Sequence, residues 1–424
     1  MVKKRIIIVF VVLSVMLCAC SEQGSSSKSS AEVSAPEAAS VRTGLDAYRY
    51  NNQIAGRQLN YAEGNYAYYY VPLTGNMIYY MDKQSGDYGP LCSRPDCLHD
   101  TNECMAYVGQ LFINSLCYWE GKLYWVSVSD YMDKPSVALW SVNEDGSGRK
   151  ILVDLTEQLY TNEYRVFFCA IDRGKLFLIS DTQSLKNESP VDKLSVLVLD
   201  LNSKKMETIF QEEYLTTVFA SYSIQQDAFF FLIPYVDDQN RPVNELYCWN
   251  MKTGELTCLM KDTESGKPFR EFWMDQAGTC YFSSWNSDTG NGEQRSRVYC
   301  MRNGKAEAIP SLDIFGYEGY SLSDGIAVVL ASQMDGNIIA LKRICIKKFN
   351  GETIYEGEIS IPEIITESSV AYGGNLIYGN EHEMIFEVRA RKAGESVLRQ
   401  YLVYYQAGEE GLKPILFMEH MPVG

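Results

Sequence analysis

The chain has 424 residues, of which 46% are hydrophobic and 22% are charged, and its formal net charge is −16. A chain of this length and apolar content can bury a sizeable core. The negative charge argues against binding to nucleic acid and against adhesion to an anionic membrane surface, because both need basic patches. A cationic partner, a divalent metal ion or a neutral glycan is compatible with it.

The N-terminal residues have the organisation of an export signal. Lys3, Lys4 and Arg5 form a short positive region, and residues 6–17 form an apolar run. This run has the length of a signal-peptide core and is too short to span a bilayer, which takes about 20 residues. We therefore predict a signal peptide over residues 1–19.

The apolar run ends in Leu17-Cys18-Ala19-Cys20, which resembles the lipobox of bacterial lipoproteins. The resemblance implies cleavage before Cys20, lipidation of that cysteine, and a lipid anchor in the cell membrane with the chain on its extracytoplasmic side. Cleavage would leave 35 Lys and Arg against 54 Asp and Glu, a net charge of −19. An ordinary secretory peptide with incidental cysteines is the alternative.

Residues 20–44 are predicted to form a flexible tether. They are rich in Ser, Ala and Glu and contain no aromatic residue, so they cannot bury a core. A random coil of this length holds the folded part about 25 to 30 Å from the bilayer. Residues 45–424 contain no second apolar run long enough to span a membrane, and we predict that they form the folded domain.

The predicted folded domain contains an internal repeat. Each unit begins with a tight turn that precedes an apolar, aromatic-rich strand. The turn recurs at Gly64, Gly121, Gly174, Asp227, Gly278, Gly325 and Gly374. A later strand with its own turn also recurs, as in residues 78–86 and 246–254. The pattern therefore predicts four antiparallel strands in each unit.

Four-stranded units of about 50 residues are typical of propeller blades. We predict an all-β fold, a β-propeller of seven four-stranded blades over residues 45–424. Two packed sheets are the alternative, although a β-sandwich does not require the same turn at near-constant spacing. A helical turn is expected only near residues 151–159.

The blade pattern resembles the TolB-like and low-density-lipoprotein-receptor-like propellers. It is similar in particular to surface lipoproteins of Gram-positive anaerobes, which tend to carry a Cys-Pro-Cys-His-Cys cluster after the first blade. The matching residues here are Cys92, Pro95, Cys97, His99 and Cys104. The resemblance implies a fold and a location and gives no activity.

This cysteine cluster is the sharpest local feature of the sequence. Three thiols and an imidazole within residues 92–104 could close a tetrahedral zinc site, although zinc ribbons place their cysteines in two-residue-spaced pairs. In an exported protein we favour disulfides, with Cys117 as a fourth cysteine, over zinc or free thiols. No other cofactor is expected.

Two further cysteine pairs lie in predicted hairpins. They are Cys248 with Cys258, and Cys280 with Cys300. Cross-strand disulfides and buried free cysteines are both open for them.

The sequence lacks the common catalytic motifs, including the Gly-x-Ser-x-Gly elbow, the Walker loop and His-Glu-x-x-His. Long loops on one face of a propeller would then carry function. Five residues from these loops form a candidate ligand face: Tyr131, Tyr235, Asp237, Asp238 and Trp285. Aromatic and acidic side chains suit stacking on sugar rings or gripping a peptide.

We therefore predict a membrane-anchored, non-enzymatic lipoprotein that binds an unknown protein, peptide or glycan ligand and no nucleic acid. One alternative is a secreted carbohydrate-active enzyme that uses paired carboxylates on the same scaffold. The other is an accessory factor in envelope assembly.

Overall fold

The computed structural model describes residues 60–420, apart from gaps within that range. The gaps are residues 73–74, 112–115, 130–135, 160–163, 187–188, 215–220, 276, 287–294, 316–317, 322–324, 336–337, 361, 363–368, 380–381, 393–398 and 409–410. The described residues belong to a compact unit that spans Pro36–Gly424. The predicted signal peptide, Cys20 and the tether lie outside the described residues.

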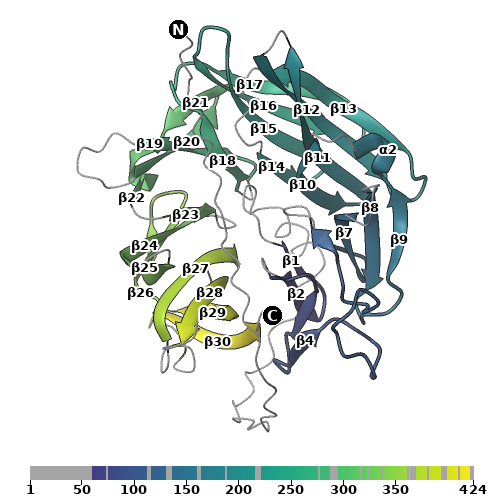
Figure 1. Cartoon of the computed structure of the whole chain (residues 1–424). Coiled ribbons are helices and arrows are strands. Elements are labelled where there is room, and N and C mark those ends of the chain that lie inside the picture. Colours follow the sequence, from purple (N-terminus) through teal and green to yellow (C-terminus); the bar gives the residue numbers. More distant parts are fainter. Residues whose placement is uncertain are drawn as a thin grey trace, which may run out of the picture. The chain divides into compact units, whose positions relative to one another are not determined.

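The described residues form seven antiparallel sheets, each built from strands that follow one another along the chain (Figure 1). The first sheet contains β1 (Asn60–Glu63), β2 (Ala67–Val71), β3 (Tyr79–Asp82) and β4 (Tyr88–Pro90). The second contains β5 (Gln110–Leu111), β6 (Cys117–Trp119), β7 (Lys122–Ser129), β8 (Ser136–Asn143) and β9 (Lys150–Asp154). The third contains β10 (Tyr164–Asp172), β11 (Lys175–Lys186), β12 (Ser189–Asp200) and β13 (Met206–Tyr214).

The remaining four sheets follow the same plan. The fourth contains β14 (Ser221–Gln225), β15 (Ala228–Val236), β16 (Pro242–Asn250) and β17 (Leu256–Asp262). The fifth contains β18 (Phe269–Met274), β19 (Cys280–Asn286), β20 (Arg295–Arg302), β21 (Lys305–Ala308) and β22 (Ile314–Phe315). The sixth contains β23 (Glu318–Ser321), β24 (Gly325–Asp335), β25 (Ile338–Lys348) and β26 (Thr353–Glu358). The seventh contains β27 (Ser369–Gly379), β28 (Glu383–Lys392), β29 (Arg399–Gly408) and β30 (Gly411–His420).

Two short helical segments interrupt the strands of the described residues, α2 (Thr156–Leu159) and the 3-10 turn η1 (Pro310–Leu312). The first falls within the predicted helical turn, and the Asp154 carboxylate accepts a hydrogen bond from the Thr156 N–H at its start. Among the described residues, no helix is both long enough and apolar enough to cross a membrane.

The repeated turns have the backbone geometry that two-residue hairpins require. Glu120 and Gly121 have φ of 44° and 74°, and Arg173 and Gly174 have φ of 47° and 70°. Positive φ at both central residues matches the right-handed twist of the flanking strands, and glycine adopts it without steric cost. The first turn of the repeat therefore sets the register of these hairpins.

The later turn of the repeat uses a side chain to hold the backbone. The side-chain oxygens of Asp82, Asp200 and Asn250 each accept hydrogen bonds from the N–H groups two and three residues further on. Asp and Asn commonly stabilise turns in this way. The prediction of a recurring strand and turn in residues 78–86 and 246–254 is confirmed.

The last repeated turn was placed wrongly from the sequence. Gly374 lies inside β27 and pairs with Val388, and the chain reverses only after Gly379. A glycine inside a strand weakens the strand without ending it, so the pairing continues past residue 374. The pairing of β11 with β12 is also long, since it continues as far as Lys186 and Ser189.

The core is divided into layers between sheets. Seven clusters of buried side chains lie among the described residues, and each joins two sheets. Six of them join sheets that are consecutive in the chain, and the seventh joins the first sheet to the last through residues such as Tyr70, Met81 and Ile385. Strands that bury both faces against neighbouring sheets define a β-propeller, and the predicted fold class is confirmed.

Candidate functional site

The predicted cysteine cluster is brought together in the connection between β4 and β5. The ligand atoms of Cys92, Cys97, His99 and Cys104 all lie within 4.8 Å of one another. Cys104 is fully buried, and the other three residues are half-buried. We call these four residues the Cys3His group.

The polypeptide that carries the group is fixed along the edge of the first sheet. The Ile78 N–H donates to the Ala106 carbonyl over 2.8 Å, and the Val108 N–H donates to the Asn76 carbonyl over 2.8 Å. Ala106 and Val108 are buried in the core between the first and second sheets. Cys104 is therefore anchored by the strand-like segment that follows it.

Backbone N–H groups surround the thiols. Burial disfavours ionisation of Cys92, but the N–H groups of Arg94 and Met105 donate to its sulfur and outweigh burial, so its pKa is lowered. Burial raises the pKa of Cys104 to about 12, even though the Ala106 N–H donates to that sulfur. The pKa values of the two thiols thus differ because Cys92 has more N–H donors and Cys104 is more deeply buried.

His99 faces Cys104 from a backbone conformation that few residues adopt. Its Nδ1 lies 3.3 Å from the Cys104 sulfur. Its φ is 58°, in the left-handed region where histidine is found more often than most residues with a Cβ. The imidazole can act there either as a hydrogen-bonding partner of the thiol or as a ligand beside it.

Arg149, from the turn before β9, holds the far end of the same connection. Its guanidinium donates to the carbonyls of Cys104, Tyr107 and Asn102 over 2.7, 2.9 and 2.7 Å. The same group lies over the ring of Trp140, 5.6 Å from its centroid. One planar cation therefore satisfies three carbonyls of an irregular segment.

Cys117 is not a fourth member of the group. It lies on β6 in the core between the second and third sheets, whereas Cys104 lies in the core between the first and second. Adjacent Leu116 points into the latter core, and successive strand residues face opposite sides. The nine cysteines whose side chains the structure describes are free thiols, so the disulfides favoured from the sequence are absent among them.

The candidate ligand face is described only in part. Tyr131 lies outside the described residues, and Trp285 is placed by its backbone alone, where it pairs with Ser296. Tyr235 and Asp237 are half-buried, and Asp238 is exposed at the tip of the β15–β16 hairpin. The structure thus describes the side chains of three of the five predicted residues, all from the β15–β16 hairpin.

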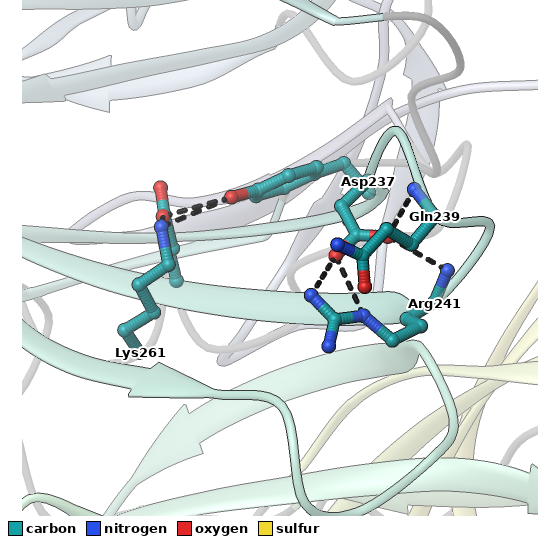
Figure 2. Close-up of polar contacts among 6 residues, drawn as sticks. Asp237, Gln239, Arg241 and Lys261 are labelled. Atoms are coloured by element: carbon teal, nitrogen blue, oxygen red, sulfur yellow. Dashed lines mark hydrogen bonds and ion pairs between the residues drawn. The ribbon is translucent and has the colours of Figure 1, made fainter.

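Asp237 is the residue that shapes this hairpin tip. Its carboxylate accepts hydrogen bonds from the Gln239 N–H and the Arg241 N–H, and from the Arg241 guanidinium over 2.7 and 2.9 Å (Figure 2). The bonds from Arg241 are the main reason that the pKa of Asp237 is lowered. The carboxylate is an internal turn cap, as Asp commonly is in tight turns.

A second carboxylate, Glu245, lies further from the hairpin tip, on β16 opposite Ile233. It accepts hydrogen bonds from the hydroxyls of Tyr235 and Tyr247 over 2.9 and 2.7 Å. Its Oε1 lies 2.7 Å from the Nζ of Lys261 on β17, the lysine labelled in Figure 2. Burial raises the pKa of Glu245, but these partners outweigh it and the pKa is lowered. Tyr214, from the adjacent third sheet, packs on Tyr235 with ring centroids 4.7 Å apart. We call Tyr235, Glu245, Tyr247 and Lys261 the Glu245 cluster.

Sequence reasoning missed Glu245 and Arg149. Glu245 gave little signal, because it follows another polar residue, Asn244, and directly precedes the segment predicted to begin at residue 246. Arg149 had none, because its three carbonyl partners are 42 to 47 residues away in the chain.

The sheets, their cores and these two groups define the chain as a β-propeller with a Cys3His group in its first intersheet connection. No protein-family model and no curated protein matches the sequence. Several solved structures are similar to it at low identity. The chain is 11% identical to the β-propeller domain of the Trilobed protease from Pyrococcus furiosus, with a TM-score of 0.43 over 72% of this chain and 83% of that one.

Two other solved structures illustrate the range of these similarities. An acylaminoacyl peptidase from Pyrococcus horikoshii is 11% identical, with a TM-score of 0.46 over 82% of this chain and 50% of the peptidase. The WD40 domain of SCAP from fission yeast is 10% identical, with a TM-score of 0.39 over 74% of this chain and 75% of that domain. Scores this low carry no argument about ligand or activity.

Proposed function

We propose that the chain is an extracytoplasmic lipoprotein, held at the cell membrane through Cys20, whose propeller binds a ligand or protein partner without chemical turnover. The anchor rests on the sequence of residues 1–20, which combines a positive region, an apolar run and a lipobox-like end. The tether of residues 20–44 gives the propeller reach from the bilayer.

The ionisation of two carboxylates supports the proposal that the propeller binds a ligand without turnover. The pKa values of Asp237 and Glu245 are both lowered by partners within their own sheet. A glycosidase that uses two carboxyl groups needs one of them protonated as the general acid, which requires a raised pKa. Two carboxylates that stay ionised do not supply this acid, so their hairpin suits recognition better than proton transfer.

The side chains around these carboxylates define the chemistry of a ligand. Tyr235 and Tyr247 are half-buried, so each presents ring surface and keeps its hydroxyl in the Glu245 cluster. The side chain of Lys261 is 58% exposed. Aromatic rings beside polar groups suit a neutral sugar or an extended peptide. We favour a neutral glycan, because no surface of net positive charge is required to hold it.

Binding and turnover can be measured on the same samples. Full-length protein in mild detergent is mixed with a panel of neutral oligosaccharides, and intrinsic fluorescence is recorded together with the release of reducing ends. We expect saturable binding with no release, and we expect Tyr235→Ala to weaken binding at least about tenfold because it removes a stacking ring. Tyr66→Ala is the matched control, since Tyr66 is a 71% exposed tyrosine of the first sheet.

Two outcomes would overturn the proposal. Release of reducing ends that is abolished by Glu245→Gln would make the chain an enzyme. Equal binding by the wild type, Tyr235→Ala and Tyr66→Ala would remove the ligand from this face. The anchor has its own readout: the wild type should partition into detergent with the added mass of lipid, and Cys20→Ala should remain unlipidated.

A further inference from the structure

We propose that Cys92, Cys97, His99 and Cys104 bind a zinc ion that fixes the connection between the first and second sheets. Three thiolates and one imidazole are a ligand set of structural zinc sites. In a tetrahedral site of this kind the ligand atoms lie about 3.5 to 3.8 Å apart. The four ligand atoms here lie within 4.8 Å of one another, so a contraction of about 1 Å closes the site around the metal.

The surroundings of the sulfurs fit a metal centre. The N–H groups of Arg94 and Met105 donate to the Cys92 sulfur, and the Ala106 N–H donates to the Cys104 sulfur. Donors of this kind orient ligand atoms and delocalise the charge of bound thiolates. Two of the three thiols therefore have outer partners that a metal site would use.

A nearby cation also balances the charge that the site would carry with zinc bound. Zn²⁺ with three thiolates and a neutral imidazole carries a single negative charge. The Arg149 guanidinium, which donates to the Cys104 carbonyl over 2.7 Å, supplies a positive charge next to it. Because this cation already has three carbonyl partners, it remains in place whether or not the metal is bound.

The position of the group indicates a structural role. Residues 91–106 form neither strand nor helix, and an irregular connection of this length inside a compact domain usually needs a cross-link or a function. Four protein ligands fill the coordination shell of zinc and leave no place for water or substrate. The metal would hold His99 and Cys97 onto Cys104, which is anchored in the core between the two sheets.

A disulfide within the group is the alternative to bound zinc, and the two states differ in mass and in metal content. The group contains three thiols and no fourth cysteine, because Cys117 lies in another core. A disulfide could join only two of the thiols, with loss of two hydrogens, and would leave the third thiol and the imidazole without a shared partner. Metal content and intact mass therefore distinguish the two states directly.

Full-length protein, purified in mild detergent without chelators, tests the proposal. Elemental analysis and native mass spectrometry should find about one zinc per chain, and denaturation should release it and leave Cys92, Cys97 and Cys104 open to alkylation. Replacing zinc by Co²⁺ should give the visible absorption of tetrahedral cobalt with thiolate ligands. Removal of the metal should lower Tm by about 5 °C.

The variants Cys97→Ser and His99→Gln should lose at least about 90% of the zinc, as expected when a structural site loses one of four ligands. Both residues are half-buried, so these changes leave the core intact. Cys258→Ser, at an exposed cysteine of the fourth sheet, is the matched control and should retain the metal.

Three results would overturn the proposal. They are wild-type protein that lacks zinc and is two hydrogens lighter through a disulfide within the group, wild-type protein in which Cys92, Cys97 and Cys104 are all thiols but which takes up no added zinc or cobalt, and zinc that persists in both ligand variants. If a ligand variant fails to fold, the cobalt spectrum of the wild type still decides, because sites made of oxygen or nitrogen ligands lack the thiolate absorption.

Discussion

The hydroxyl of Tyr70 on β2 donates a hydrogen bond to the Glu387 carboxylate on β28, and this bond joins the first sheet to the last. The two residues lie 317 positions apart in the chain. Glu387 is fully buried, and its other partner is the Arg389 guanidinium. Because each sheet in the described residues is made of consecutive strands, side-chain contacts of this kind join the first and last sheets within the part of the chain that the structure describes.

Tyr70→Phe should therefore destabilise the fold. The substitution keeps the ring in the core and removes the hydroxyl, which leaves a buried carboxylate with one partner fewer. We expect a loss of about 1.5 to 3 kcal/mol, as for hydrogen bonds to charged groups. Thermal unfolding of the full-length protein measures it, with Tyr66→Phe at an exposed tyrosine as the control. An unchanged Tm would mean that Glu387 needs only Arg389.

Glu245→Gln should destabilise the protein at neutral pH and have little effect in acid. The folded-state pKa of Glu245 is lowered, so its contribution is complete above the unfolded value of about 4.3 and is lost as the pH falls through the folded value. We expect the variant to lose about 1 to 2 kcal/mol at pH 7. The difference in Tm from the wild type should shrink below about pH 4.

Glu255→Gln, at an exposed position in the turn before β17, is the control for this pH series. A Tm difference between wild type and Glu245→Gln that stays constant from neutral to acid pH would show that Glu245 gains nothing from its ionised form in the fold.

Gly146→Ala should disrupt the contact between the β8–β9 turn and the Cys3His group. Gly146 has φ of 78°, and a Cβ there would lie 2.9 Å from the Cys92 backbone nitrogen and 3.0 Å from that of Ser93. Gly254→Ala is a matched control, because its φ is 72° and nothing lies within 4 Å of the added Cβ. Both variants carry a left-handed backbone cost of about 1 to 2 kcal/mol.

Only Gly146→Ala adds the collision with backbone, so its Tm should fall clearly further than that of Gly254→Ala. Equal losses would show that the turn can move away from Cys92 without cost.

Arg149→Lys should loosen the connection that carries Cys104. A lysine keeps the charge but lacks the planar fork that reaches three carbonyls at once. We expect a loss of about 1 to 3 kcal/mol and faster amide hydrogen exchange in residues 104–108. Arg302→Lys, at an exposed arginine of the fifth sheet, should change neither. Unchanged exchange in residues 104–108 would count against a holding role for Arg149.

The hairpins were predictable because their determinants are local. Turn residues such as Gly121 and Asn250 act on their own neighbours, so their spacing in the sequence already indicates the sheets. The turn predicted at Gly374 is wrong because this glycine pairs with Val388 on β28. The spacing of the repeat gives no information about that pairing partner. Local chemistry predicts which segments pair, and pairing partners decide where a strand ends.

The cysteine pairs show what register adds. A bulge between Leu246 and Tyr247 places Cys258 opposite Tyr247 and Cys248 opposite Thr257. Cys258 and Cys248 therefore face opposite sides of the sheet. Cys300 pairs with Tyr281 and lies in a different core from Cys280. A shift of one residue, invisible in the sequence, excludes both cross-strand pairs.

The Cys3His group was predictable only as a set of residue types. Its spacing does not match common zinc motifs, and the approach of His99 to Cys104 depends on a left-handed residue and on the anchoring of Ala106 to Ile78. The contact between Ile78 and Ala106 joins the first sheet to the segment after the cluster, and no sequence motif indicates it. The choice between disulfide and metal therefore turns on three-dimensional placement.

The closure through Tyr70 and Glu387 also sets an order of events for a growing chain. Five of the intersheet cores use only strands of the first six sheets, so they can assemble as these strands emerge, but the last two cores need β28 and β29. Until then the face of the first sheet that carries Tyr70 and Met81 is not covered by the last sheet. A prematurely terminated product that lacks the last sheet would expose this surface permanently, and exposed sheet faces of this kind invite aggregation and proteolysis.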